Sequence, residues 1–289
     1  MQIVTDTGMD LHLPPDQSPE IEIHIVRHAI TLDGKTYFSG ADIQPEELQK
    51  MLMATSSFPT TSQPSAGDFA ATYKRLAASD PDILSIHMSS GLSGTVNAAH
   101  AGAEMTPEAH VTIVDTKTLC AAQGWQVAAA ARALKAGWPL DQILALIERI
   151  GAASDSMYTL DDLKYLIHGG RISHMKGLIA SLLNLRPMIG VEHEHGTYEQ
   201  LGTARTFDRA LQGLVELMTK RHPRGSALRV QVLHAYNPPA VERLRELIDP
   251  LFECTWLPTT SMSPVLAAHT GPSMAGVAFA PSATFDDIT

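Results

Sequence analysis

The sequence predicts an α/β fold with two lobes, and three observations lead to this prediction. Short apolar runs rich in β-branched residues alternate with helix-compatible segments, an amphipathic helix ends at Gly151, and a similar alternation then resumes. Such alternation favours helices packed on a sheet that is mainly parallel in the first half. We therefore expect two α/β domains, over residues 1–153 and 154–289, with a ligand cleft between them.

The first half is divided by its apolar runs and its turn residues. Between Ile30 and Phe38, the pair Asp33-Gly34 favours a type I′ turn, which predicts a small antiparallel hairpin. The other predicted elements are helices over residues 45–54, 65–78 and 121–136, and strands over residues 2–5, 22–26 and 111–115 and around Ile83.

The second half follows a helix over residues 139–150, which Pro139 opens and whose apolar residues recur at helical spacing. His195-Gly196 is typical of a hairpin turn. The remaining predicted elements are helices over residues 161–167, 178–183, 207–220 and 239–247, and strands over residues 188–191, 198–201 and 228–234 and near Met157, Phe252 and Val277.

Composition excludes several functional classes. Of 289 residues, 44% are hydrophobic and 18% charged, and the formal net charge of -10 argues against nucleic-acid binding. Charged and helix-breaking residues interrupt the apolar segments, so no membrane span is predicted. Asp6 stands where a signal peptide would be basic or apolar, which predicts a cytoplasmic protein. Cys120 and Cys254 lie in apolar surroundings and are predicted to be reduced thiols that bind no metal.

A turn rich in serine and glycine, residues 89–94, connects the strand at Ile83 to an alanine-rich helix that begins at Thr95. Backbone N–H groups and hydroxyl donors at such a helix start hold a carboxylate or a phosphate without a formal positive charge. The segment on its own is equally compatible with Ser93 as the N-cap of an ordinary helix.

Eight different short motifs are spread over nearly the whole chain. They are residues 4–7 (VTDT), 61–64 (TSQP), 89–95 (SSGLSGT), 162–166 (DLKYL), 169–173 (GGRIS), 186–188 (RPM), 204–206 (ART) and 269–272 (HTGP). Each motif alone is weak, but in their order and spacing the chain resembles the bacterial DegV family of fatty acid binders.

The resemblance implies two α/β domains with a long-chain fatty acid, such as palmitate or oleate, in a tunnel between them. It implies that Thr61, Ser93 and Gly94 hold the carboxylate at the serine-glycine turn and that His269 supports this head-group site. No cofactor besides the ligand is expected. The residues expected behind the head-group site are Asp6, Thr7, Ser62, Thr95 and Arg171.

The resemblance also implies a partner, a separate ATP-dependent fatty acid kinase to which the chain presents the carboxylate for acyl phosphate formation. Arg205 matches a family arginine on the face that docks the kinase. Taken alone, Arg205 would be an exposed surface charge, Arg171 an exposed residue after a helix stop, and His269 a packed core histidine.

A serine hydrolase is the main alternative, because residues 91–95 follow a strand and precede a helix as a nucleophile elbow does. In that interpretation Ser93 is the nucleophile, His269 is the base and Asp6 is the acid that orients the base. Thr95 stands where the elbow motif has glycine, which weakens this alternative.

Two further motifs point to other chemistry but fit it poorly. Residues 34–36 (GKT) resemble the end of a phosphate-binding loop, yet they belong to the predicted hairpin. His193-Glu194-His195 lies at a predicted hairpin tip and lacks the helical spacing of zinc ligands, so a polar turn is expected there.

Overall fold

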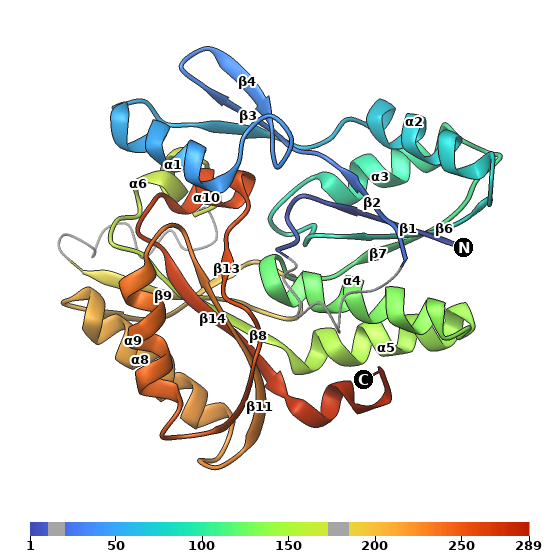
Figure 1. Cartoon of the computed structure of the whole chain (residues 1–289). Coiled ribbons are helices and arrows are strands. Elements are labelled where there is room, and N and C mark those ends of the chain that lie inside the picture. Colours follow the sequence, from blue (N-terminus) through green and yellow to red (C-terminus); the bar gives the residue numbers. More distant parts are fainter. Residues whose placement is uncertain (11–20, 173–184, 289) are drawn as a thin grey trace.

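The computed structural model describes residues 1–10, 21–172 and 185–288, and the predicted helix over residues 178–183 lies outside this part of the chain. The described strands form a parallel sheet, a larger and mostly antiparallel sheet, and a small antiparallel sheet (Figure 1). The predicted α/β fold with two lobes and a parallel sheet in the first lobe is therefore confirmed.

The first sheet is parallel, and two helices cover one of its faces. Val4 and Ile83 point into the core on that face, whereas the neighbouring residues Ile3 and Leu84 point to the opposite face, because side chains alternate along a strand. Across the sheet the strands are β2 (Ile23–Val26), β1 (Gln2–Asp6), β6 (Asp82–His87) and β7 (His110–Asp115), and the two helices are α2 (Ala66–Ala77) and α3 (Thr95–Glu104).

The predicted hairpin is part of the small antiparallel sheet. Asp33 and Gly34 have φ angles of 50° and 76°, and a type I′ turn requires positive φ at both positions. Thr61, opposite Ile30, lies in the third strand of this sheet, which places it at a defined point beside the hairpin. The elements are β3 (Ala29–Leu32), β4 (Lys35–Phe38) and β5 (Thr60–Ser62), and α1 (Pro45–Ala54) follows the hairpin.

The second sheet carries helices α8 (Phe207–Arg221) and α9 (Pro238–Ile248), whose residues Leu214 and Leu244 are fully buried. Its described strand pairs are antiparallel except those of β11 with β12 and β13. Across the sheet the strands are β10 (Tyr198–Ala204), β9 (Arg186–Val191), β8 (Asp155–Thr159), β14 (Ala275–Pro281), β11 (Ala227–His234) and β12 (Glu253–Trp256), with β13 (Thr260–Ser261) also beside β11.

Helices α4 (Cys120–Lys135) and α5 (Leu140–Ala153) lie between the two large sheets (Figure 1). Nearly all of α4 is buried, and its many alanine side chains let both lobes approach it closely. The Trp125 indole N–H donates to Gln231 Oε1 on β11 over 2.8 Å, which ties α4 to the second lobe. The predicted domain limit at residues 153/154 coincides with the end of α5 and stays a prediction.

Helix boundaries differ from the prediction in the second lobe. Helix α6 (Lys164–His168) begins three residues later than expected, because Asp162 Oδ1 accepts the Lys164 N–H over 2.7 Å before the helix starts. Helix α10 (Pro264–Thr270) and the C-terminal 3₁₀ helix η3 (Ser282–Ile288) were not predicted. In the described parts of the chain, no helix has the length and apolar character needed to cross a bilayer.

Candidate functional site

A cavity opens where the carboxyl ends of β2 and β6 meet β5 and α10. Open α/β sheets bind ligands at this edge, between strands whose connections run to opposite sides. Three residues predicted for the head-group site, Thr61, Ser93 and His269, line this one cavity, whereas Gly94, also predicted for it, is not among the lining residues. Arg171, expected behind the site, lines the cavity as well. The other lining residues are His28, Gln63, Met88, Leu92, Tyr198, Val265 and Leu266.

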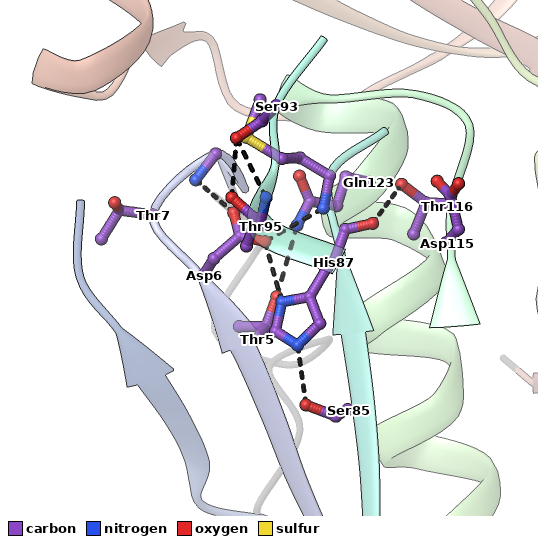
Figure 2. Close-up of polar contacts among 12 residues, drawn as sticks. Thr5, Asp6, Thr7, Ser85, His87, Ser93, Thr95, Asp115, Thr116 and Gln123 are labelled. Carbon is purple, nitrogen blue, oxygen red and sulfur yellow. Dashed lines mark hydrogen bonds and ion pairs between the residues drawn. The ribbon is translucent and has the colours of Figure 1, made fainter. Parts of the chain in front are cut away.

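Ser93 reaches the cavity from the loop that precedes α3. Gly94 is the N-cap residue of α3, so the interpretation of Ser93 as an ordinary N-cap is wrong. The Ser93 hydroxyl lies 2.7 Å from Thr95 Oγ1 and accepts the Thr95 N–H over 3.3 Å (Figure 2). The N–H groups of Leu92 and Ser93 both donate to Ser89 O over 3.1 Å, so these two amides are already used inside the turn.

Gly94 is needed for close packing beside Ser93. A Cβ atom at Gly94 would lie 2.2 Å from Gln63 Oε1, so glycine lets the loop after β5 reach the start of α3. Gly91 has a similar function, because a Cβ atom there would lie 2.4 Å from His195 O in the loop between β9 and β10. The serine-glycine turn therefore contacts both the small sheet and the second lobe.

Thr61 and His269 meet across the cavity. Thr61 Oγ1 lies 2.7 Å from His269 Nε2, and the other ring nitrogen, Nδ1, is buried without a hydrogen-bond partner among the described residues. A Cβ atom at Gly169 would lie 2.2 Å from Nδ1, so the ring packs directly on this glycine. Burial, with Arg171 and His28 nearby, lowers the pKa of His269 to about 3, which keeps the imidazole neutral at pH 7.

Arg171 brings a positive charge to the cavity, which corrects the expectation of a site without one. Its guanidinium donates to Gly169 O over 2.6 Å and to Leu92 O over 3.4 Å, and these bonds link the end of α6 to the serine-glycine turn. Arg171 therefore adds an attractive field for an anion to the hydroxyl donors of Thr61 and Ser93.

Asp6 lies behind the cavity and does not line it. Its carboxylate accepts the Gly8 N–H, the Met88 N–H and a bond with His87 Nδ1, over 2.7, 3.0 and 2.9 Å (Figure 2). Burial alone would raise the pKa of Asp6, but His87, His28 and the Met88 N–H hold that pKa below its ordinary value. Asp6 thus joins the ends of β1 and β6.

His28 lines the cavity and was not predicted from the sequence. It is 3% exposed, with Nδ1 2.9 Å from Thr7 Oγ1 and Nε2 3.0 Å from Thr95 Oγ1. Thr95 contacts Ser93 directly, whereas Thr7 is connected to Ser93 only through this ring and Thr95. His28 follows β2, the neighbour of β1, and a polar residue just past the carboxyl end of a parallel strand is a usable signal for a ligand site.

Two further predicted residues neither line the cavity nor support a residue that does. Ser62 is exposed on β5, where strand alternation turns its side chain away from the face that carries Thr61. Arg205 is exposed in the short connection between β10 and α8 and makes no hydrogen bond or ion pair with the described residues.

A second, almost wholly apolar cavity lies next to the first. Tyr198 lines both cavities, so a polar and an apolar cavity adjoin at this side chain. The other residues that line the apolar cavity are Leu119, Tyr158, Leu160, Leu166, Ile189, Met262 and Thr270.

The geometry contradicts the serine hydrolase alternative. His269 contacts Thr61, and its Nδ1 has no acidic partner among the described residues, so nothing orients it as a base toward Ser93. Asp6, the candidate acid, is bonded to His87 instead. A histidine with a pKa of about 3 is also a weak base.

The His193-Glu194-His195 motif forms a polar turn, as expected. The carboxylate of Glu192 accepts the N–H groups of Glu194, His195 and Thr197 over 2.8 to 3.1 Å. In the described ranges, no three His, Cys, Asp or Glu side chains are arranged to hold a metal ion.

Comparisons with known proteins agree on one family. The profile described as "Uncharacterised protein, DegV family" matches residues 1–282. A DegV domain-containing protein of Deinococcus radiodurans is 31% identical over 283 residues, which cover 97% of this chain and 96% of that protein.

Two solved structures are similar along the whole chain. A DegV family protein from Thermus thermophilus, described by its fatty acid binding, has a TM-score of 0.84 and 30% identity and covers 97% of this chain and 99% of its own. DegV from Bacillus subtilis, described as a fatty acid binding protein, has a TM-score of 0.84 and 26% identity with the same coverage.

Proposed function

Because this chain belongs to the DegV family, we propose that it binds a long-chain fatty acid, with the carboxylate at Thr61 and Ser93 and the acyl chain in the apolar cavity. The observation that carries this proposal is that a polar cavity and an apolar one share Tyr198 in their linings. The fatty acid binding of the Thermus thermophilus and Bacillus subtilis structures supports it.

The head-group site holds the carboxylate through hydroxyl donors and one nearby cation. Ser93 and Thr61 each donate a hydrogen bond to a carboxylate oxygen, and Arg171 contributes an attractive charge from the same wall. Thr61 Oγ1 lies 2.7 Å from His269 Nε2, and in the tautomer protonated at Nε2 the ring donates to Thr61, which leaves the Thr61 hydroxyl proton for the ligand.

The acyl chain contributes most of the binding free energy. Each buried methylene is worth about 0.8 kcal/mol, so a palmitate chain gains roughly 10 kcal/mol before ordering costs. Hydrogen bonds to a charged group contribute about 1.5 to 3 kcal/mol each. Affinity therefore rises with chain length, while the polar residues set which end of the ligand lies at the cavity mouth.

We further propose that the bound carboxylate is presented to a separate ATP-dependent kinase. A carboxylate oxygen then forms a bond to the γ-phosphorus of ATP, the bond to the β,γ-bridging oxygen breaks, and ADP leaves. The acyl phosphate product stays in this protein. Arg205, exposed and without a partner among the described residues, is the proposed contact for the kinase.

Organic extraction of the purified protein followed by mass spectrometry tests the ligand directly. We expect an equimolar long-chain fatty acid, and binding of added palmitate or oleate after delipidation. Recovery of no fatty acid, together with no binding of either acid, would contradict the proposal.

A further inference from the structure

Behind Ser93, four residues from three segments form an unbroken series of hydrogen bonds. Thr7 Oγ1 lies 2.9 Å from His28 Nδ1, His28 Nε2 lies 3.0 Å from Thr95 Oγ1, and Thr95 Oγ1 lies 2.7 Å from Ser93 Oγ. Thr7, His28 and Thr95 are at most 7% exposed. Of these four residues, Ser93 and His28 line the cavity, and Ser93 stands at the end of the series.

The direction of this series follows from a backbone group. The His28 N–H donates to Thr7 Oγ1 over 3.1 Å, and an N–H group can only donate. The Thr7 hydroxyl proton then has one described acceptor, His28 Nδ1. A neutral imidazole that accepts at Nδ1 carries its proton on Nε2, so His28 donates to Thr95.

The same direction continues to the ligand. Thr95 accepts from His28, so its own hydroxyl proton is directed to Ser93 Oγ. Ser93 Oγ also accepts the Thr95 N–H over 3.3 Å. A hydroxyl has one proton and two lone pairs, so both acceptor positions of Ser93 are filled and only its proton is left for the cavity.

The reverse direction leaves a buried polar group without a partner. If Ser93 donated to Thr95 and Thr95 donated to His28 Nε2, then Nδ1 would donate to Thr7 Oγ1. The Thr7 hydroxyl proton would then have no acceptor among the described residues, and an unpaired buried donor is costly. Burial, which outweighs the opposing charge of Asp6, lowers the pKa of His28, and this favours the neutral ring that the series requires.

We propose that His28 is a positioning residue that, through Thr7 and Thr95, makes Ser93 a hydrogen-bond donor only, so that the site selects an ionised carboxylate over an alcohol. This inference rests on the proposed binding of a fatty acid. A carboxylate has only acceptor oxygens and matches a donor-only Ser93, whereas an alcohol must place its own proton elsewhere.

Ligand selectivity separates this function from a merely structural one. In His28→Leu the Thr95 hydroxyl is free to turn, so Ser93 can donate to it instead of to the ligand. We expect oleate affinity to fall about tenfold while oleyl alcohol affinity stays within about twofold of the parent. In His28→Gln the side-chain amide can donate to Thr95 from about the position that Nε2 of His28 occupies in the parent. This variant should therefore keep most of the oleate affinity that His28→Leu loses. Equal losses for oleate and oleyl alcohol in His28→Leu would overturn the proposal.

The tautomer of His28 is a second, independent readout. Long-range ¹H–¹⁵N correlation spectra of ¹⁵N-histidine-labelled, oleate-bound protein should show His28 protonated at Nε2 and bare at Nδ1, with the signals assigned by their loss in His28→Gln. Protonation at Nδ1 would overturn the proposal. A parent protein that bound no oleate would instead contradict fatty acid binding itself, so the two failures are distinguishable.

Discussion

The hydroxyl oxygen of Thr61 lies 2.7 Å from Nε2 of His269, although 208 positions separate the two residues in the chain. Thr61 belongs to the small sheet of the first lobe, and His269 belongs to α10 of the second part of the chain. A carboxylate at the proposed site beside Thr61 would therefore lie at a contact between segments that come together only in the folded protein. Substitutions near His269 should therefore change the affinity for the ligand even where the substituted residue does not contact the ligand.

Removal of either hydroxyl should weaken carboxylate binding. We expect Ser93→Ala and Thr61→Val each to reduce the binding free energy of oleate by about 1.5 to 3 kcal/mol, because each removes a hydrogen bond to a charged group. Isothermal titration calorimetry on delipidated protein measures this loss. Ser62→Ala is the matched control, since the exposed Ser62 side chain is next in sequence to Thr61 but on the other face of β5. Parent-like affinity in both site variants would exclude these hydroxyls as ligand contacts.

Gly169 should influence the site through His269. An alanine Cβ atom there would lie 2.2 Å from Nδ1, so the ring must move and its contact with Thr61 must weaken. We expect Gly169→Ala to reduce the binding free energy of oleate by about 0.5 to 1.5 kcal/mol, the net contribution of one hydrogen bond such as that between Thr61 and His269. Gly67→Ala is the control, because its added Cβ atom would meet Ser65 Oγ at an ordinary 3.6 Å within α2. If Gly169→Ala bound oleate like the parent, direct packing of the ring on Gly169 would not matter for the site.

Local signals account for the elements that were predicted correctly. The Asp33-Gly34 turn and the apolar run around Ile83 depend on residues that are adjacent in sequence, so their structures follow from propensity and periodicity. Helix α10 was missed although Ser263-Pro264 is typical of a helix start, because the flanking residues are apolar throughout and show no amphipathic period.

The candidate site was only partly predictable, because its contacts are long-range. Periodicity carries no information on the contact between residues 61 and 269, and only the family resemblance paired them. Ser93 and Gly94 both suit an N-cap, so the sequence did not decide which one caps α3. The charge of Arg171 reaches the cavity through tertiary packing that no local pattern describes, whereas the position of His28 just past a parallel strand was a signal that the prediction did not use.

The protonation of His269 should appear in the acid stability of the protein. Its pKa is about 3 in the folded state and ordinary, near 6.5, in the unfolded state, so between these values the unfolded chain binds more protons. Stability therefore falls as the pH drops below about 6.5. We expect His269→Gln to lose less stability than the parent between pH 7 and pH 5 in urea unfolding. His100→Gln, at an exposed position in α3, should keep the parental slope, and identical slopes for all three proteins would contradict a buried, neutral His269.

Phosphorylation of the bound fatty acid should require a second protein. Phosphoryl transfer depends on a phosphate cradle and bound Mg²⁺, which we assign to the kinase. With ATP and Mg²⁺ alone, the oleate-loaded protein should form no acyl phosphate, and addition of a cognate kinase should produce it. Mass spectrometry after hydroxylamine trapping, which converts the acyl phosphate to a hydroxamate, detects the product. Acyl phosphate formed by the isolated chain would overturn the carrier function.

Arg205 should act on the encounter with that kinase and not on the ligand. It is exposed and has no hydrogen bond or ion pair with the described residues, so its replacement removes a surface charge without disturbing the fold. A charge at the rim of an interface acts mainly on association, so Arg205→Ala should lower the phosphorylation rate at limiting carrier while oleate affinity stays parental. Arg224→Ala removes another exposed arginine from the same lobe and should leave the rate unchanged. Equal phosphorylation rates for Arg205→Ala, Arg224→Ala and the parent would remove Arg205 from the docking surface. If the rate difference between Arg205→Ala and the parent disappears at high salt, the contribution of Arg205 is electrostatic attraction of the kinase.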